Sequence, residues 1–292
     1  GCGGEMFEVR WVIHRSEHWH CSGWRQWLWV LQREDGRQEK AMMRVRAAIL
    51  EQELEDIQIE ARRIGRAPFV LQIGAMDGVG HDHMHPFIKS GTWRGLFVEP
   101  LKDYFDALQE NYRSLGEEGA LMFANKCIAE SSGRRTMHRL APSALKGVGA
   151  ELLGLDGSSS LLADSAGMPP GIARSIKHGG GEVLREQVAA HMVEEEVECV
   201  TLSGLLSEFD VQELDAMAID TEGYDLEIVR QLLKTPIRPR VIFLEIGLLS
   251  GRDQDEAHTI LQAEGYTTRP CGYGMELLAV KRQLLPPPEP EL

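Results

Sequence analysis

Three acidic residues within six positions could carry chemistry in this 292-residue chain. Asp220, Glu222 and Asp225 directly follow the apolar run 214–219. Carboxylates this close raise one another's pKa, which would suit a general base, and they could equally bind a divalent cation that activates a hydroxyl. Alternatively, they only form hydrogen bonds where a strand meets a helix. Glu245, at the end of another apolar run, is a further candidate base.

A glycine-containing loop and another acidic residue form a candidate ligand site. The loop follows the apolar run 69–73 and contains Gly74, Ala75, Met76, Asp77 and Gly78. Glu99, followed by Pro100, closes the next apolar run, 95–98. This layout is typical of nucleotide sites, in which the acid accepts hydrogen bonds from ribose hydroxyls. Because the spacing is not G-x-G-x-x-G, a ligand with a ribose but no pyrophosphate, such as S-adenosylmethionine, fits better. Alternatively, the glycines merely form a turn.

Alternating strands and helices are predicted to position these residues. The predicted strands are 69–73, 95–98, 120–125, 197–200, 214–219 and 241–244, and the predicted helices include 101–112, 202–209, 226–233 and 256–264. A closing antiparallel hairpin is predicted over 266–270 and 275–281. This order is typical of a doubly wound α/β sheet, whose ligands bind at the carboxyl ends of the strands. Asn125 follows such a strand and could read an adenine edge or close a turn.

The segment 142–196 interrupts this alternation. It is rich in glycine and serine, as are many lids and binding loops. We therefore expect it to cover the substrate. His178, within it, is a candidate general base, although most histidines in loops have no catalytic role.

The first 66 residues form a predicted extension in two parts. Residues 1–40 hold five of the six tryptophans, together with His14, His18, His20 and Cys21. A metal site or an aromatic docking surface is one interpretation, and a poorly packed extension is the favoured one. The helix 43–64 carries an apolar stripe at heptad spacing. This stripe is expected to pack on its own domain, with a homodimer as the alternative.

Composition limits the classes of partner and site. A net charge of −14 argues against a nucleic-acid partner, because phosphate contacts need clustered Lys and Arg. Five scattered cysteines favour reduced thiols in a cytoplasmic protein, and no run is long enough to span a membrane. The histidines at 81, 83 and 85 do not all share one helical face. A metal site at these histidines is therefore not expected, and no dedicated metal site is assigned, with a cation at the acidic cluster left open.

Four segments in register resemble FkbM-type S-adenosylmethionine-dependent methyltransferases. The segments are 72–78, 96–100, 219–225 and 243–246, and the serines at 158–160 are also similar. The resemblance implies a Rossmann-like class I methyltransferase sheet of seven mostly parallel strands with a C-terminal antiparallel hairpin, preceded here by the helical extension. The implied domains are 1–66 (extension), 67–283 (methyltransferase, with the insertion at 142–196) and 284–292 (Pro-rich tail).

The resemblance also implies roles for residues of the site. The loop at Gly74 would hold the methionine part of the cofactor and Glu99 the ribose diol. Asn125 would lie beside the adenine, and Asp220 near the cofactor's amino group or sulfonium. We therefore expect methyl transfer from S-adenosylmethionine to a hydroxyl of a small metabolite, sugar or glycan precursor. The alternatives are a nicotinamide-dependent oxidoreductase and a non-catalytic binding module.

Overall fold

The computed structural model describes most of the chain. The described residues are 11–19, 25–33, 39–80, 82–144, 158–164, 167–179, 185–186, 188–271 and 274–281, with side chains from residue 49 onward except at 178–179. The chain divides into two compact units, Gly1–Glu51 and Gln52–Leu292. The boundary lies within helix α1 (Glu39–Arg63), ahead of the expected domain start at residue 67.

The first unit contains a hairpin that the sequence pattern did not predict. Strands β1 (Trp11–Trp19) and β2 (Arg25–Arg33) pair antiparallel. His20 and Cys21 lie outside the described residues, as do the side chains of the tryptophans and of the other histidines in this segment. The metal and docking interpretations of this segment therefore remain predictions.

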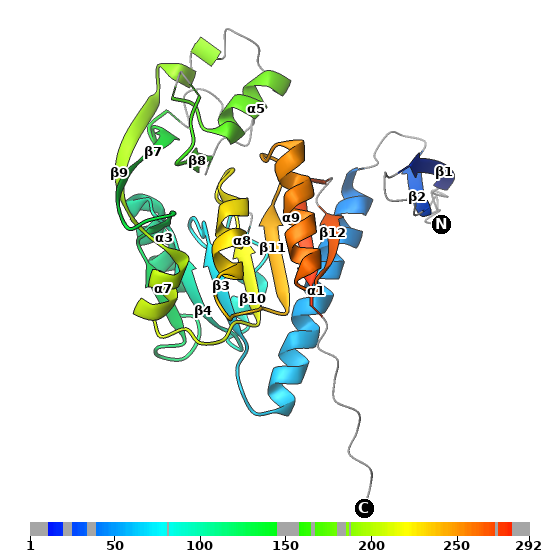
Figure 1. The fold of residues 1–292 in the computed structure, drawn as a ribbon, viewed down its shortest axis with the longest axis horizontal. Helices are drawn as coiled ribbons and strands as arrows, with labels where there is room; N and C mark the ends of the chain where they lie inside the picture. Colours follow the sequence, from blue (N-terminus) through cyan, green and yellow to red (C-terminus); the bar gives the residue numbers. More distant parts are fainter. Residues whose placement is uncertain are drawn as a thin grey trace, which may run out of the picture. The chain divides into compact units, whose positions relative to one another are not determined.

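A seven-stranded sheet forms the centre of the second unit (Figure 1). Its order is β12-β13-β11-β10-β3-β4-β5. The strands are β3 (Phe69–Ile73), β4 (Arg94–Val98), β5 (Leu121–Ala124), β10 (Ala216–Ile219), β11 (Val241–Glu245), β12 (Thr267–Cys271) and β13 (Glu276–Val280). Neighbouring strands from β5 to β11 are parallel, and β13 runs antiparallel to both of its neighbours. The predicted class I methyltransferase topology is confirmed.

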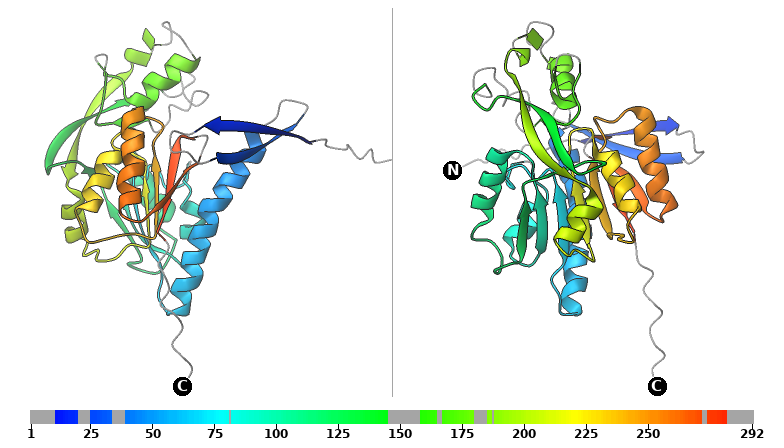
Figure 2. Two further views of the ribbon diagram at one scale, coloured as in Figure 1. Left: turned by 45° about the vertical axis from the view of Figure 1, so that its right-hand side comes forward. Right: turned by 60° about the vertical axis from the view of Figure 1, so that its left-hand side comes forward.

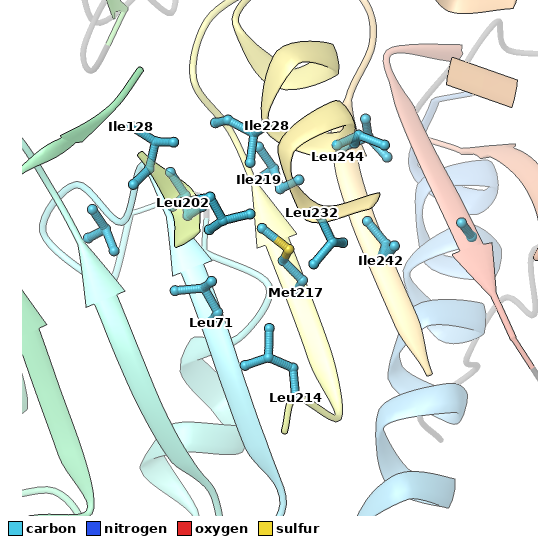
Figure 3. Packing of buried hydrophobic residues seen from close by; sticks show 14 of the residues in the cluster. Leu71, Ile128, Leu202, Leu214, Met217, Ile219, Ile228, Leu232, Ile242 and Leu244 are labelled. Atoms are coloured by element: carbon cyan, nitrogen blue, oxygen red, sulfur yellow. The ribbon is translucent and has the colours of Figure 1, made fainter. Parts of the chain in front are cut away.

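Short helices connect the strands and cover the sheet. They are α2 (His85–Lys89), α3 (Lys102–Tyr112), α7 (Leu202–Glu208), α8 (Asp225–Leu233) and α9 (Gly251–Ala263). Figure 3 shows Met217 and Ile242, on neighbouring strands, close to Leu232 of α8. All three are almost fully buried, and burying such a side chain contributes about 1.5–3 kcal/mol. This core fixes the strand ends at which the predicted site residues lie.

The C-terminal half of α1 packs on its own domain. Leu54, Ile57 and Ala61 are at most 3% exposed, whereas Ile64 is 71% exposed. Arg240, which precedes β11, pairs with Glu60 at 2.7 Å. The stripe from residue 54 to 61 is therefore covered by the chain itself. A homodimer through the rest of the 43–64 helix remains a prediction.

A second, four-stranded sheet lies beyond the carboxyl ends of the central strands (Figures 1 and 2). Its order is β6-β9-β7-β8, and its strands are β6 (Cys127–Ile128), β7 (Gly133–Leu140), β8 (Ser159–Ser160) and β9 (Met192–Val200). Helix α5 (Pro170–Gly179) packs with it. Much of the segment expected to cover the substrate thus stands over the carboxyl edge of the central sheet.

The described helices include none that is long and apolar enough to cross a membrane. The Pro-rich tail, 284–292, lies outside the described residues.

Candidate active site

A cavity of about 230 Å³ opens where the two sheets meet. From the central sheet it is lined by Ile73, Gly74, Met76, Glu99, Pro100 and the segment 220–222 with Tyr224. From the second sheet and its flanking residues it is lined by 126–128, Met137, Ser158, Ser159 and Leu161. Gly74 and Met76 of the glycine loop, the ribose candidate Glu99 and two of the clustered acids therefore face one cavity.

Gly74 lies where two strand ends come into contact. Its φ is +80°, and a Cβ built there would lie 1.7 Å from the backbone oxygen of Asp220. The Gly74 N–H donates to Val98 at 2.9 Å. No side chain fits between β3 and β10 at this point, so the loop requires glycine.

Glu99 is a buried carboxylate at the cavity wall. It is 3% exposed, and it accepts hydrogen bonds from the backbone N–H groups of Met76 (2.9 Å) and Leu101 (2.8 Å). Burial raises the pKa of Glu99 to about 7, against the lowering effect of these hydrogen bonds. Each carboxylate oxygen has a further lone pair. Glu99 is therefore fixed in position and can still accept from the hydroxyls of a ligand.

Four other predicted cofactor residues lie near this wall in the sequence but do not line the described cavity themselves. Asn125 donates to the carbonyls of Glu99 and Pro100, at 2.9 Å each. The Asp77 carboxylate accepts from the backbone N–H groups of Val79 and Gly80. The Gly78 carbonyl accepts from the Tyr112 hydroxyl at 2.7 Å. Ala75, Asp77, Gly78 and Asn125 are not among the described residues that line the cavity. Their contact with a cofactor remains a prediction.

Glu222 is the most constrained of the clustered acids. Its backbone is left-handed, with φ +56°. Its Oε1 accepts from Ser158 at 3.3 Å, and its buried Oε2 has no hydrogen-bond partner among the described residues. A Cβ on Gly171, in the first turn of α5, would lie 2.1 Å from Oε2. Burial, and then the charges of Asp220 and Asp225, raise the pKa of Glu222 to about 8.

The remaining acids divide between structural and candidate chemical roles. Asp225 is fully buried and accepts from the N–H groups of Thr221 (3.2 Å) and Gly223 (3.1 Å), so it holds the loop. Asp220 is exposed and lines the cavity. Glu245 lies beside them, and burial, followed by the charges of Asp220 and Glu222, raises its pKa to about 9.

Asp220, Glu222 and Glu245 could together hold a divalent cation. Each offers one carboxylate oxygen, and these oxygens lie within 4.8 Å of one another. One oxygen of Glu245, like Oε2 of Glu222, is buried and has no partner among the described residues. Hard cations prefer such oxygen ligands. The cluster fits a cation as well as it fits a shared proton, so the expectation of no dedicated metal site remains untested.

His83 lies near the acidic cluster, although the sequence pattern singled it out only as a weak metal candidate. Its ring packs edge-on against Phe243 at 5.1 Å, and its Nε2 lies 3.9 Å from Glu276. Glu276, with a smaller effect from Asp220, raises the pKa of His83. His81 and the side chain of His178 lie outside the described residues, so the role of His178 as a base remains a prediction.

We expect the pH dependence of stability to reflect Glu245. An unfolded glutamate has a pKa of about 4.3, so the folded protein retains a proton that the unfolded chain loses. The contribution of Glu245 to the free energy of unfolding should therefore be largest below about pH 4 and fall as pH rises toward 9. Glu245→Gln, which stays neutral, should flatten this fall in denaturant titrations. Glu117→Gln, at an exposed loop position, is the control. Equal slopes in all three proteins would contradict the assignment.

Several solved methyltransferase structures resemble this chain distantly. Methyltransferase FkbM from Methylobacillus flagellatus KT is 11% identical, with a TM-score of 0.41 over 73% of this chain and 43% of that chain. A methyltransferase described as putative, from Thermoplasma acidophilum, is 10% identical, with a TM-score of 0.34 over 75% and 71%. The chain thus spans less than half the length of the FkbM structure that it matches. These similarities are too distant to inform on substrate.

A family model matches most of the chain. Among curated proteins, no sequence matches the chain. The model described as the methyltransferase FkbM domain matches residues 72–274, which include the glycine loop, Glu99, the second sheet and the acidic cluster. Because this match covers more than two thirds of the 292 residues, the chain belongs to the FkbM methyltransferase domain family.

Proposed function

We propose that the cavity binds S-adenosylmethionine and that the protein transfers the methyl group to a hydroxyl oxygen of a small metabolite, sugar or glycan precursor. One observation carries this proposal. The close contact at Gly74, the buried acceptor Glu99 and the protonatable carboxylate of Glu222 all border the same cavity.

Different residues of the cavity would bind the ribose and the methionine part of the cofactor. Glu99 accepts hydrogen bonds from the ribose diol, because its carboxylate keeps free lone pairs at the cavity wall. Gly74 lets the ends of β3 and β10 come together at the cavity wall, where the methionine part would lie, and the nearby carboxylate of Asp220 suits a cationic group. When bound, S-adenosylmethionine supplies an electrophilic methyl group on a sulfonium.

The protein's own residues position the acceptor and take its proton. The hydroxyl oxygen must lie in line with the bond that breaks, so orientation supplies much of the rate enhancement. The proton of the hydroxyl passes to Glu222, whose pKa of about 8 is close to an operating pH at which a general base is effective. Burial and the charges of Asp220 and Asp225 set that pKa, and Ser158 orients one oxygen.

The family match favours methyl transfer over the nicotinamide-dependent alternative. A cytoplasmic location and the lack of nucleic-acid and membrane partners remain predictions from composition.

Incubation with S-adenosylmethionine labelled in its methyl group tests the acceptor class. The panel should contain hydroxylated metabolites, free sugars and glycan precursors, with matched amines and carboxylic acids. We expect label in a methyl ether, which withstands mild alkali. Label confined to amines, or released by alkali as from a methyl ester, would contradict O-methylation.

A further inference from the structure

Two cysteines lie directly opposite each other in the second sheet. Strands β6 and β9 are parallel, and Cys127 pairs in register with Cys199. Paired residues on neighbouring strands project on the same side of a sheet. Both side chains accordingly belong to one buried cluster, which also contains Met137 and Val197. On its other side Cys199 is opposite Gly133 of β7, which has no side chain.

The spacing of the two strands suits a disulfide. Neighbouring strands lie about 4.8 Å apart. The Cα atoms of disulfide-bonded cysteines are about 4.4–6.8 Å apart, so the bond requires no change of register. The backbone at this point is also anchored, since Ala129 donates to Val200 at 2.9 Å and Gln231 bonds both Ala129 and Leu202. The side chains, rather than the strands, must therefore move.

The two thiols differ in access and in charge. Cys127 lines the cavity, whereas Cys199 is completely buried. A hydrogen bond between the thiols, with the positive charge of Arg135 as a smaller influence, lowers the pKa of Cys199. The same hydrogen bond, together with burial, raises the pKa of Cys127. Cys127, which lines the cavity, is thus paired with Cys199, whose lowered pKa favours the thiolate. The thiolate is the nucleophile in disulfide formation.

We propose that Cys127 and Cys199 are an oxidisable pair whose disulfide weakens ligand binding in the cavity. The Cys127 thiol transfers its proton to the departing oxygen of a peroxide that has entered the cavity, while its sulfur forms an S–O bond and the O–O bond breaks. That oxygen leaves as water. The Cys199 thiolate then attacks the Cys127 sulfur and expels hydroxide, which the proton from Cys199 converts to a second water. Two thiols and one hydrogen peroxide yield one disulfide and two waters.

The disulfide changes the cavity wall. The two thiols already share a hydrogen bond, so forming the disulfide draws the Cys127 sulfur closer to Cys199 and shifts a side chain that lines the cavity beside Met137. A ligand that fills the cavity should conversely shield Cys127 from peroxide. Oxidation and ligand binding should therefore oppose each other.

Peptide mapping of the peroxide-treated protein tests the cross-link. Trypsin releases Cys127 in the peptide 127–134 and Cys199 in the peptide 186–230. We expect these two peptides to be joined in the wild-type protein and not in Cys199→Ser. The link should persist in Cys271→Ser, because Cys271 lies on a different strand, β12. No joined peptide, or a faster link through Cys2, Cys21 or Cys271, would overturn the proposal.

Calorimetry with S-adenosylhomocysteine tests the effect on the cavity. We expect affinity to fall about tenfold or more on oxidation, equivalent to 1.4 kcal/mol, and to return with dithiothreitol. Saturating S-adenosylhomocysteine should slow formation of the link. Cross-linked protein with unchanged affinity would overturn the effect on binding. The peptide map does not rest on the proposed function. If the reduced protein binds no S-adenosylhomocysteine but peroxide still forms the link, only the assignment of the cofactor would be contradicted.

Discussion

Replacing Gly74 by alanine is expected to abolish ligand binding and to lower the free energy of unfolding by more than about 3 kcal/mol. The new Cβ would lie 1.7 Å from the Asp220 backbone oxygen, and the left-handed φ of +80° already disfavours a side chain. Relieving this overlap requires β3 and β10 to separate at the point where the cavity begins. Denaturant titration measures the loss of stability, and calorimetry with S-adenosylhomocysteine measures the loss of binding.

Gly119→Ala is the matched control for this variant. Its φ is +76°, and a Cβ there meets no atom within 4 Å. It should therefore lose only the cost of the left-handed backbone, about 1–2 kcal/mol, and keep its ligand affinity. Similar losses of stability in the two variants would show that the contact with Asp220 is unimportant.

Glu222→Gln is expected to reduce turnover about 10²- to 10⁴-fold, the usual contribution of a general base. Because burial and neighbouring charges raise the pKa of Glu222 to about 8, the carboxylate that accepts a proton forms only as pH approaches this value. Wild-type kcat should therefore rise with pH and level off above about 8, and Glu222→Gln should lack this rise. The amide is neutral and nearly isosteric, so folding should be retained. The measurement is kcat against pH with the acceptor found by the labelling experiment.

Glu227→Gln, in the first turn of α8, is the matched control for the charge change. Glu227 contacts Arg230 at 3.5 Å and is not among the described residues that line the cavity. Its variant should keep the wild-type pH profile. A Glu222→Gln protein that retained both turnover and the pH profile would assign the base to another residue, with Glu245 and His83 the next candidates.

The central sheet could be predicted because its signals are local. The run from Phe69 to Ile73 is apolar and short, and Glu99 directly follows a similar run. Parallel strands place their carboxyl ends at one edge, so the loop at Gly74 and the acid at Glu99 had to approach each other. The structure confirms this topology.

The second sheet could not be predicted from such local signals. Strand β7 contains three arginines and a histidine and lacks apolar alternation. One of these arginines, Arg139, is only 3% exposed because Asp103 (2.7 Å) and Glu195 (3.2 Å) neutralise it from distant parts of the chain. Strand β9 (Met192–Val200) contains three consecutive glutamates, at 194–196. Only its last residues, 197–200, therefore matched the strand pattern.

The detailed roles of site residues also depend on distant partners. Asn125 lies at the expected strand end, but its amide is used to hold the carbonyls of Glu99 and Pro100. His83 acquires its environment from Phe243 and Glu276, and Cys127 acquires its neighbour from Cys199. No local pattern reports these long-range contacts.

Calorimetric titration with S-adenosylhomocysteine, with NADH in parallel, tests the central claim most directly. We expect micromolar binding of S-adenosylhomocysteine and none of NADH. Glu99→Gln should weaken binding about 10- to 150-fold, because a hydrogen bond to a charged acceptor contributes about 1.5–3 kcal/mol. Glu110→Gln, at an exposed position on α3, should bind as the wild type does. A folded wild-type protein that bound no S-adenosylhomocysteine, or a Glu99→Gln variant with unchanged affinity, would contradict the assignment of this cavity as the cofactor site.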